Sequence, residues 1–249
     1  MGILSINPKI SVIIPTKNAG FYLLDCLHSI QNQTYENIEI IIADSLSTDN
    51  TIDIIKSNNF MISHYFSGPD SGIYDGMNKA ISYANGEWLI FLGADDRIYA
   101  NDSIEIIVNN FKNLANYTDI SLILCDGFCR GKLLINNFDW KIFKGNSINH
   151  QCVLYNKNIF NNFSYDISYK YGADYKLNLN LYLRKICYIK LNKILSVYNE
   201  FGATSKYIND CLLEEKRVRK ELLPLPLSVL INFVFDMKVF FKSLKFNVL

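Results

Sequence analysis

Short apolar runs alternate with segments of helical periodicity in the first hundred residues of the chain. Residues 9–14 (KISVII) and 38–43 (IEIIIA) are β-branched, are too short for helices and are typical of buried parallel strands. Between them, residues 21–30 carry apolar side chains at a spacing that places them on one face of a helix. The chain therefore begins with a predicted strand, helix and strand.

The same alternation continues to about residue 100. A polar group, Ser47, Thr48 and Asp49, follows the second strand and suits the N-cap of another helix. The next three elements are predicted as a strand, a helix and a strand, at residues 62–66, 73–84 and 88–92. This order predicts an α/β fold, a Rossmann-like wound and mostly parallel sheet flanked by helices, which binds ligands at the carboxyl ends of its strands.

The pattern becomes less regular after residue 102. We expect helices ending at about residue 114 and spanning 173–184. The strands expected in this half lie at residues 120–124, 151–155, 186–189 and 195–198. The length fits one large domain, which we place at residues 1–206, followed by a C-terminal helical tail at 207–249.

The tail differs in composition from the rest of the chain. A charge run at 214–220 precedes an apolar segment at 222–235. That segment is interrupted at Pro224, Pro226 and Asn232. A membrane span needs about 20 unbroken apolar residues, so we expect no crossing. Three lysines then alternate with apolar residues, at Lys238, Lys242 and Lys245. This mixture predicts a helix lying on an anionic membrane surface, and a helix packed on the domain or on a second chain is the alternative.

Charge and cysteine content narrow the functional classes. The chain has 25 Lys and Arg against 24 Asp and Glu, so no overall field would draw it to nucleic acid. Its six cysteines have no paired spacing and are expected to be reduced thiols in the cytoplasm. Residues 1–10 lack the basic and apolar regions of a secretory signal, so we expect no secretion.

Two adjacent carboxylates, Asp95 and Asp96, lie within the sequence FLGADDR at the end of a predicted buried strand. Such a pair is costly unless a cation lies beside it. Carboxylate oxygens suit Mg²⁺ or Mn²⁺ that bridges a substrate diphosphate. The alternative is a solvated turn that caps the next helix.

Polar residues also follow the first two strands. A lone carboxylate such as Asp44, at the end of the second strand, can accept hydrogen bonds from the base or ribose of a nucleotide. The exit of the first strand, residues 15–18, lies beside it in this topology and offers Pro15, Thr16 and Asn18 to the same ligand. Taken singly, Asn18 is equally explained as a turn residue.

A third polar segment, GPDSGIYDGMNKA at residues 68–80, precedes and enters a predicted helix. It contains Asp70, and the helix presents Asn78 and Lys79. Lys79 could neutralise a phosphate as a point charge. Taken by itself, Lys79 is better explained as an exposed surface lysine.

Three blocks, SVIIPTKN, IEIIIADSLSTDNT and SGPDSGIYDGMNKAISYANGEWLIFLGADD, cover residues 10–96 almost continuously. Together they resemble the N-terminal half of bacterial family 2 glycosyltransferases of the GT-A fold, especially enzymes that build O-antigen and colanic acid. Two later segments are similar to the acceptor half of that subgroup, namely His150-Gln151 and residues 164–181.

The resemblance implies a nucleotide-sugar half at 1–100 and an acceptor half at 101–206. It implies that the donor is bound by residues of the three blocks, namely Pro15, Thr16, Asn18, Asp44, Asp70, Asn78, Lys79 and Asp95. A divalent metal, Mn²⁺ or Mg²⁺, would be held by Asp95 and Asp96. Many relatives have Asp where this chain has Gly93, so the metal depends on these two carboxylates alone.

On the acceptor side, the family's catalytic base falls on Asp174, with Asp166 as second choice. His150 and Gln151 would lie near the acceptor. Asp174 would take the acceptor proton during a single displacement that inverts the anomeric configuration. A partly buried Asp174 is expected to be a stronger base.

The resemblance implies transfer of a hexose, with UDP as the expected carrier, to a sugar acceptor linked to polyprenyl diphosphate. This reaction would belong to lipopolysaccharide or O-antigen biosynthesis, on the inner face of the cytoplasmic membrane, with a homodimer possible. A sugar nucleotidyltransferase is disfavoured because PTKNAGFY at residues 15–22 contains a single glycine. A catalytically inactive homologue that acts as an assembly subunit is the alternative.

Overall fold

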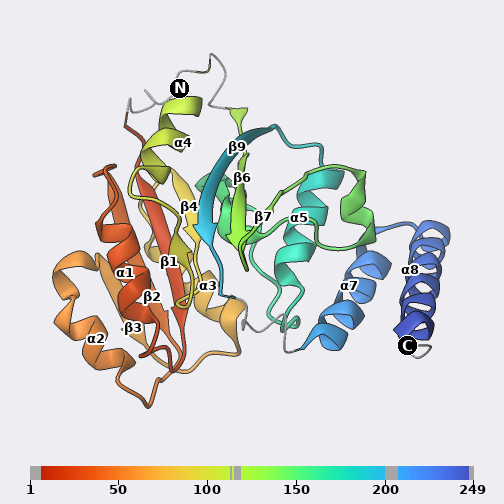
Figure 1. The fold of residues 1–249 in the computed structure, drawn as a ribbon, viewed down its shortest axis with the longest axis horizontal. Coiled ribbons are helices and arrows are strands. Elements are labelled where there is room, and N and C mark those ends of the chain that lie inside the picture. Colours follow the sequence, from red (N-terminus) through yellow and green to blue (C-terminus); the bar gives the residue numbers. More distant parts are fainter. Residues whose placement is uncertain (1–6, 113, 115–118, 200–206, 247–249) are drawn as a thin grey trace.

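The computed structural model describes residues 7–112, 114, 119–199 and 207–246, with side chains described as far as Met237 in the last segment. One continuous curled sheet runs through the molecule and is covered by helices on both faces (Figure 1). The tail helices lie beyond the acceptor half, at the side opposite α1 and α2. The predicted α/β class is confirmed.

The first half consists of alternating strands and helices. Its strands are β1 (Ile10–Thr16), β2 (Ile38–Asp44), β3 (His64–Ser67), β4 (Trp88–Phe91) and β5 (Arg97–Ile98). Its helices are α1 (Leu23–Gln31), α2 (Thr51–Ser57), the short η1 (Asn59–Met61), α3 (Ile73–Tyr83) and α4 (Ser103–Phe111). The predicted elements are all present here, with ends that move by a few residues.

The second half is less regular. Its strands are β6 (Leu122–Cys129), β7 (Lys132–Leu134), β8 (Val153–Asn156) and β9 (Tyr188–Val197). Its helices are η3 (Trp140–Lys144), η4 (His150–Cys152), η5 (Lys157–Asn161) and α5 (Ala173–Leu183), followed by the tail helices α7 (Ile208–Leu222) and α8 (Leu225–Phe246). Two predicted strands, at 186–189 and 195–198, are one long strand, because β9 pairs along β6 and then β5.

The sheet order is β3-β2-β1-β4-β8-β6-β9-β5, with β7 beside β6. The strands β1 to β4 pair in parallel, whereas β8 is antiparallel to both β4 and β6. Parallel pairing is therefore continuous from β1 to β4, and the second half adds one further parallel pair, β6 with β9. The predicted end of β1 before Pro15 is wrong, since the strand continues through Pro15 and Thr16, which are opposite Ala43 and Asp44 of β2.

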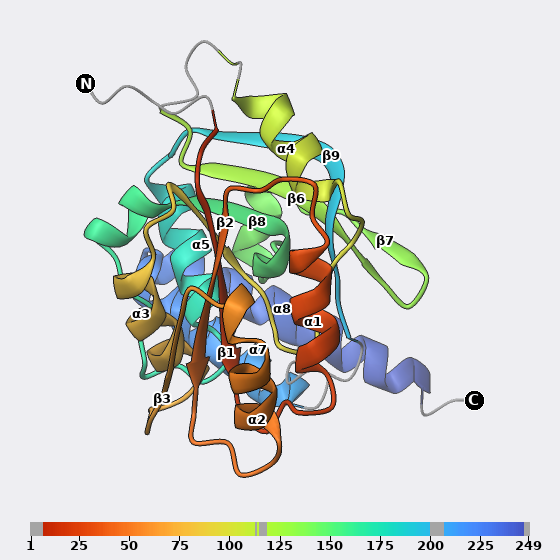
Figure 2. The same cartoon turned by 90° about the vertical axis from the view of Figure 1, so that its left-hand side faces the viewer.

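Alternate side chains of the strands fill two apolar cores. One face of the sheet packs against α1, α2 and α4, through side chains such as Leu27, Ile55 and Ile107. The other face packs against α3 and α5, through side chains such as Met77 and Leu177. Figure 2 shows α3 and α1 on opposite sides of the strands. Burial on both faces explains why β1 and β2 are continuous apolar runs.

The helix α8 is continuous despite Pro226, since a proline in the first turn of a helix removes no required hydrogen bond. Its polar residues Ser228 and Asn232 are buried, and the buried Arg219 of α7 donates from Nε to Asn232 Oδ1 at 2.6 Å. Most of its described apolar residues are exposed, namely Leu225, Leu227, Val229, Leu230, Phe233, Val234 and Met237, whereas Ile231 and Phe235 are half-buried. No described helix combines the length and hydropathy that a membrane span requires.

Candidate functional site

The carboxyl ends of β1, β2 and β4 meet at one edge of the sheet, because these neighbouring strands are parallel. This edge brings together Thr16, Asp44 and the loop after β4 that carries Asp95 and Asp96. The edge of a wound sheet is the usual ligand position in such folds. The fold therefore assembles three of the predicted polar groups in one place.

Asp44 is 1% exposed and is surrounded by hydroxyl donors. Its Oδ1 accepts from Thr16 Oγ1 at 3.2 Å and from Ser47 Oγ at 2.5 Å. Its Oδ2 accepts from Ser67 Oγ at 2.6 Å and from the Ser47 backbone N–H at 3.0 Å. The carboxylate thus joins the ends of β1, β2 and β3. A nucleoside that binds Asp44 must replace one of these hydroxyl groups.

Asn18 lies in the left-handed region, with φ of 49°, a conformation that Asn adopts more readily than most residues. Its backbone N–H donates to Ser47 Oγ at 2.8 Å, and its Oδ1 accepts from the Thr48 backbone N–H at 2.8 Å. Asn18 therefore joins the loop after β1 to the loop after β2. Pro15 lies three residues before Asn18, within the buried strand β1.

The third predicted segment supplies mainly scaffold contacts. Asp70 Oδ1 accepts from Ser45 Oγ at 2.8 Å, beside the strand end that carries Asp44. The Asn78 amide bonds to both backbone groups of Tyr165, at 2.8 and 2.9 Å, and so joins α3 to the acceptor half. Lys79 is exposed and pairs with Asp75 at 3.0 Å. In this conformation neither the Asn78 amide nor the Lys79 charge is unpaired.

Asp96 is the most perturbed carboxyl group of the site. Among the described residues, its oxygens accept the backbone N–H groups of Gly93, at 3.2 Å, and Asn199, at 3.0 Å, and the nearby Gln151 side chain lowers its pKa. Burial, with a further contribution from the Asp95 charge, raises the pKa of Asp96 to about 6. Burial also raises the pKa of Asp95. A cation beside the pair would relieve both shifts.

Gly93 is the residue that allows this arrangement. A Cβ at position 93 would lie 2.6 Å from Asp96 Oδ2 and 2.9 Å from Asp95 Oδ1, closer than real contacts permit. The position at which many relatives carry a carboxylate is therefore closed to a side chain unless the Asp95 and Asp96 carboxylates shift.

A divalent metal fits the two carboxylates chemically, since they are hard oxygen ligands whose charged forms are disfavoured by burial. Among the described residues, no cluster of three or more His, Cys, Asp and Glu side chains could hold a metal by itself. Asp95 and Asp96 would therefore supply part of the coordination, and the substrate diphosphate and water would supply the rest.

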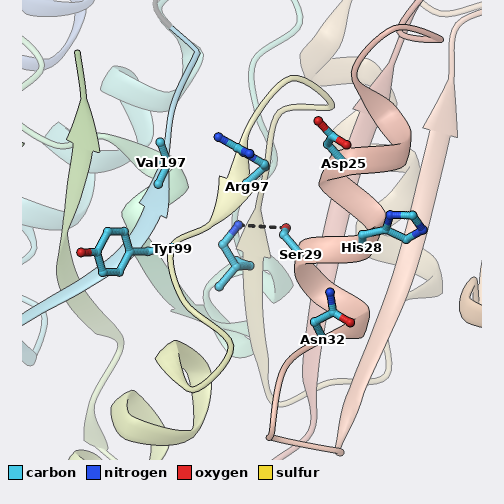
Figure 3. A pocket seen from close by; sticks show the side chains of 8 residues that line it. Asp25, His28, Ser29, Asn32, Arg97, Tyr99 and Val197 are labelled. Carbon is cyan, nitrogen blue, oxygen red and sulfur yellow. Dashed lines mark hydrogen bonds between the residues drawn. The ribbon is translucent and has the colours of Figure 1, made fainter. Parts of the chain in front are cut away.

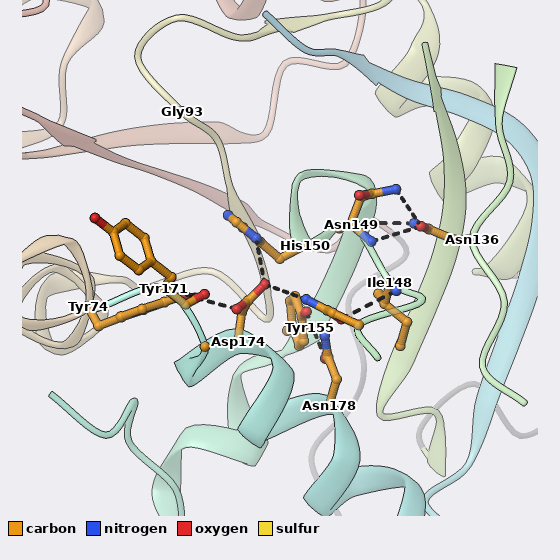
Figure 4. A network of polar contacts seen from close by, with 12 residues as sticks. Tyr74, Gly93, Asn136, Ile148, Asn149, His150, Tyr155, Tyr171, Asp174 and Asn178 are labelled. Atoms are coloured by element: carbon orange, nitrogen blue, oxygen red, sulfur yellow. Dashed lines mark hydrogen bonds and ion pairs between the residues drawn. The ribbon is translucent and has the colours of Figure 1, made fainter. Parts of the chain in front are cut away.

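Asp174 begins α5 and faces the same region from the acceptor half, where its side chain is only 10% exposed. Figure 4 shows its carboxylate among donors from three other segments. Its Oδ1 lies 2.9 Å from the Tyr74 hydroxyl. Its Oδ2 accepts from Asn146 Nδ2 at 2.8 Å and lies 3.3 Å from His150 Nδ1. Residues that are far apart in the sequence thus meet at one carboxylate.

These donors overturn one expectation about Asp174. Burial alone raises the pKa of this carboxyl, but hydrogen bonds from His150 and Tyr74 outweigh burial and hold the pKa below its ordinary value. The expectation that burial makes Asp174 a stronger base is therefore wrong. The charged form is stabilised because its partners are arranged around it.

Asp166, the second choice for the base, has different surroundings. Its Oδ2 accepts from Lys176 Nζ at 2.8 Å, which lowers the pKa of Asp166 to about 2. Among the described residues, it shares no hydrogen bond with Asp174 or His150. Gln151 lies in η4 rather than in the predicted strand, and its side chain is close enough to Asp96 to lower the pKa of that carboxyl.

Sequence reasoning missed Tyr74 and Asn146. Tyr74 lies in the SGIYDG segment that the pattern had singled out, so its hydroxyl could have been considered. Asn146 lies in an irregular stretch with no recognisable motif. Its position depends on contacts that are distant in the sequence.

The charge run of the tail, at residues 214–220, contacts the loops that lead to Asp174. Glu214 of α7 accepts three consecutive backbone N–H groups, from Lys170 at 2.8 Å and from Tyr171 and Gly172 at 2.7 Å each. Glu215 accepts the Asn146 backbone N–H at 3.1 Å. The helix α7 therefore holds both loops that lead to the Asp174 cluster.

A surface pocket of about 360 Å³ does not belong to this site. It lies between α1 and β5 and includes Asp25, His28 and Arg97 (Figure 3). None of the carboxylates discussed above lines it. We assign it no part in the chemistry.

The Glycosyl transferase family 2 profile matches residues 11–165, which is more than half of the chain. The chain belongs to glycosyl transferase family 2. A Mycobacterium tuberculosis protein named PGL/p-HBAD biosynthesis glycosyltransferase is 33% identical over 218 residues, and the match covers 82% of this chain and 81% of that protein. The chain is therefore a glycosyltransferase.

Solved structures of family members share its fold. S. aureus TarS in complex with UDP-GlcNAc matches 91% of this chain and 71% of that chain, with a TM-score of 0.67 and 17% identity. The mannosyltransferase PcManGT from Pyrobaculum calidifontis, in complex with GDP-Man and Mn²⁺, matches 90% of this chain and 68% of its own, with a TM-score of 0.66 and 17% identity. The predicted GT-A fold is confirmed.

Proposed function

We propose that this glycosyltransferase transfers a hexose from a UDP-sugar to an acceptor sugar with inversion of the anomeric configuration. The observation that carries the proposal is the meeting of Asp44, the pair Asp95 and Asp96, and Asp174 around one edge of the sheet. Asp44 would bind the nucleoside, the acidic pair would face the diphosphate, and Asp174 lies on the acceptor side.

The reaction is a single displacement in which the acceptor hydroxyl attacks the anomeric carbon and the nucleoside diphosphate leaves from the opposite face. General base assistance contributes about 10²- to 10⁴-fold to such a step. Mn²⁺ or Mg²⁺, held by Asp95 and Asp96, would supply positive charge to the leaving diphosphate. A titratable group on the acceptor side, in the cluster of Asp174 and His150, would receive the proton of the acceptor hydroxyl.

For the acceptor we propose a sugar linked to polyprenyl diphosphate, in bacterial surface polysaccharide biosynthesis of the O-antigen or lipopolysaccharide type. The enzyme would act at the cytoplasmic face of the inner membrane. Support comes from α8, most of whose described apolar side chains are exposed, and from the lysines that follow in the sequence. Contact of the same face with a second copy of the chain is the alternative.

A donor screen tests the reaction. The purified full-length protein, with Mn²⁺, is incubated with UDP-, GDP- and dTDP-sugars, and nucleoside diphosphate release is measured with and without EDTA. Release from a UDP-hexose that EDTA abolishes is the expected result. If no donor is cleaved and none binds in calorimetry, the inactive assembly subunit becomes the better description.

Vesicle sedimentation tests the membrane surface. Leu230 and Phe233 of α8 are 59% and 61% exposed, so the variants Leu230→Gln and Phe233→Gln should bind anionic vesicles more weakly than the unaltered protein. Leu213 of α7 is 62% exposed and provides the matched control Leu213→Gln, which should bind normally. A protein that ignores vesicles but forms a dimer disrupted by the α8 variants would support self-association instead.

A further inference from the structure

The acceptor side contains a second group suited to proton transfer, His150. Its Nδ1 lies 3.3 Å from Asp174 Oδ2, and its side chain is 19% exposed against 10% for Asp174. Figure 4 shows the other ring nitrogen, Nε2, pointing away from Asp174. Both His150 and the following residue, Gln151, lie close enough to Asp96 to lower the pKa of its carboxyl. His150 therefore lies between the buried base candidate and the acidic pair that would face the donor.

The contact with Asp174 determines the protonation pattern of the ring. An ionised carboxylate can only accept hydrogen bonds, so the hydrogen of a neutral imidazole must be on Nδ1. Nε2 then carries the lone pair. Among the residues that the structure describes, no group hydrogen-bonds to Nε2. The imidazole is thus held in the tautomer that can accept a proton from a ligand in front of it.

Asp174 itself is poorly placed to accept that proton. Both oxygens already have donors, from Tyr74 on one side and from Asn146 and His150 on the other. An acceptor hydroxyl would have to compete with these groups in a largely buried position. The lowered pKa of Asp174 points the same way, since a more acidic carboxyl is a weaker base.

A further network fixes the loop that carries His150. The fully buried Asn136 accepts the Asn149 backbone N–H at 2.8 Å and donates to the carbonyl oxygens of Cys125, at 2.9 Å, and Asn149, at 3.3 Å (Figure 4). A buried and well-bonded amide is a rigid support. The ring of His150 is therefore oriented both from its backbone and through Asp174.

We infer that His150 is the group that takes the acceptor proton and that Asp174 is its positioning residue. This inference rests on the proposed function. The acceptor oxygen bonds to the anomeric carbon while the bond from that carbon to the diphosphate oxygen breaks, and the leaving group keeps the electron pair. The hydroxyl proton moves to Nε2, and the Asp174 carboxylate stabilises the resulting imidazolium, as in other carboxylate–histidine pairs.

The test uses the full-length enzyme with the donor and acceptor identified by the screen. His150→Gly should lose about 10²- to 10⁴-fold in turnover, with donor affinity unchanged. Added imidazole should restore at least tenfold of this loss. More basic methylimidazoles should restore more, because the added base then accepts the proton. Formate should have no effect on this variant.

Asp174→Gly provides the opposite test. Two results together would overturn the inference and make Asp174 the base. Formate would restore turnover of Asp174→Gly, and imidazole would fail to restore turnover of a His150→Gly protein that binds the donor normally. A structural role for His150 would also fail to produce a dependence on imidazole basicity.

Two further variants guard against misfolding. His150→Gln keeps an N–H donor for Asp174 but has no base, and it should be as slow as His150→Gly. Turnover of His150→Gln within tenfold of the unaltered enzyme would contradict the inference. The exposed His28 on α1 supplies the control His28→Gln, which should keep full activity. An unaltered enzyme that turns over no donor would instead contradict the proposed function.

Discussion

Asp96 and Asp174 are both buried carboxyl groups of the same site, yet their pKa values shift in opposite directions. At Asp174, donors from Tyr74 and His150 outweigh burial and stabilise the charge. At Asp96, burial and the neighbouring Asp95 charge prevail over its few donors. The comparison shows that the partners of a buried carboxylate, rather than burial alone, determine its ionisation. It also shows that one group is complete within the protein and the other is suited to an added cation.

The largest effect is expected at the complete carboxylate. Asp174→Asn should lower turnover by about 10²- to 10⁴-fold because it removes the charge that holds and stabilises the base. Donor affinity, measured by calorimetry, should change little. The matched control is Asp166→Asn, which removes an ion pair with Lys176 and should keep turnover within a few-fold. An equal loss of turnover in Asp174→Asn and Asp166→Asn would contradict the role given to Asp174.

The pH dependence of stability should separate the two carboxylates. With a pKa of about 6, folded Asp96 retains its proton where the unfolded chain, with a pKa of about 3.9, has lost it. The folded state then binds more protons, so metal-free protein should lose stability as pH rises from 4 to 6, by up to about 3 kcal/mol relative to Asp96→Asn.

Urea unfolding of both proteins in EDTA measures this difference. Mn²⁺ should reduce this difference in unfolding free energy, because the cation neutralises the Asp96 carboxylate. The same comparison for Asp174→Asn should be nearly flat above pH 4.5, because the pKa of Asp174 lies below its ordinary value. If the stability difference between Asp174→Asn and the unaltered protein changed steeply above pH 4.5, the pKa of Asp174 would not be lowered.

The loop at Gly93 should tolerate no side chain. Gly93→Ala places a methyl group 2.6 Å from Asp96 Oδ2 and should displace the acidic pair, at a cost of about 1–3 kcal/mol. We expect a loss of Mn²⁺ affinity, measured by calorimetry in the presence of the nucleotide. Gly68→Ala is the matched control, since nothing lies within 4 Å of its added Cβ. Unchanged metal affinity in Gly93→Ala would remove Asp96 from the metal site.

A smaller effect should follow from weakening the support of Asp174. Glu214→Gln removes the charge that three backbone N–H groups share and should lower the unfolding free energy by about 1–2 kcal/mol. It should also reduce turnover without changing donor affinity. The control Glu221→Gln breaks a more exposed ion pair with Lys176 and should cost less than about 1 kcal/mol. If Glu214→Gln and Glu221→Gln lost comparable turnover and unfolding free energy, α7 would stabilise the whole domain rather than support the Asp174 cluster.

The sequence by itself determined the features that depend on local order. Alternating strands and helices set the parallel half of the sheet, and parallel strands bring Thr16, Asp44 and the Asp95–Asp96 loop to one edge. Their positions follow from where each strand ends, which the apolar pattern gives to within a few residues.

Only the tertiary structure decided the acceptor side. Asp174 was placed by resemblance, but its partners come from residues 74, 146 and 150, and its supporting helix begins at Ile208. No local pattern encodes such distant contacts. For the same reason the sequence did not predict the orientation of α8, in which Ser228 and Asn232 are buried while most of the described apolar residues are exposed. Hydrophobic pattern indicates which residues gather, but long-range packing determines the environment of each charge, and that environment sets its chemistry.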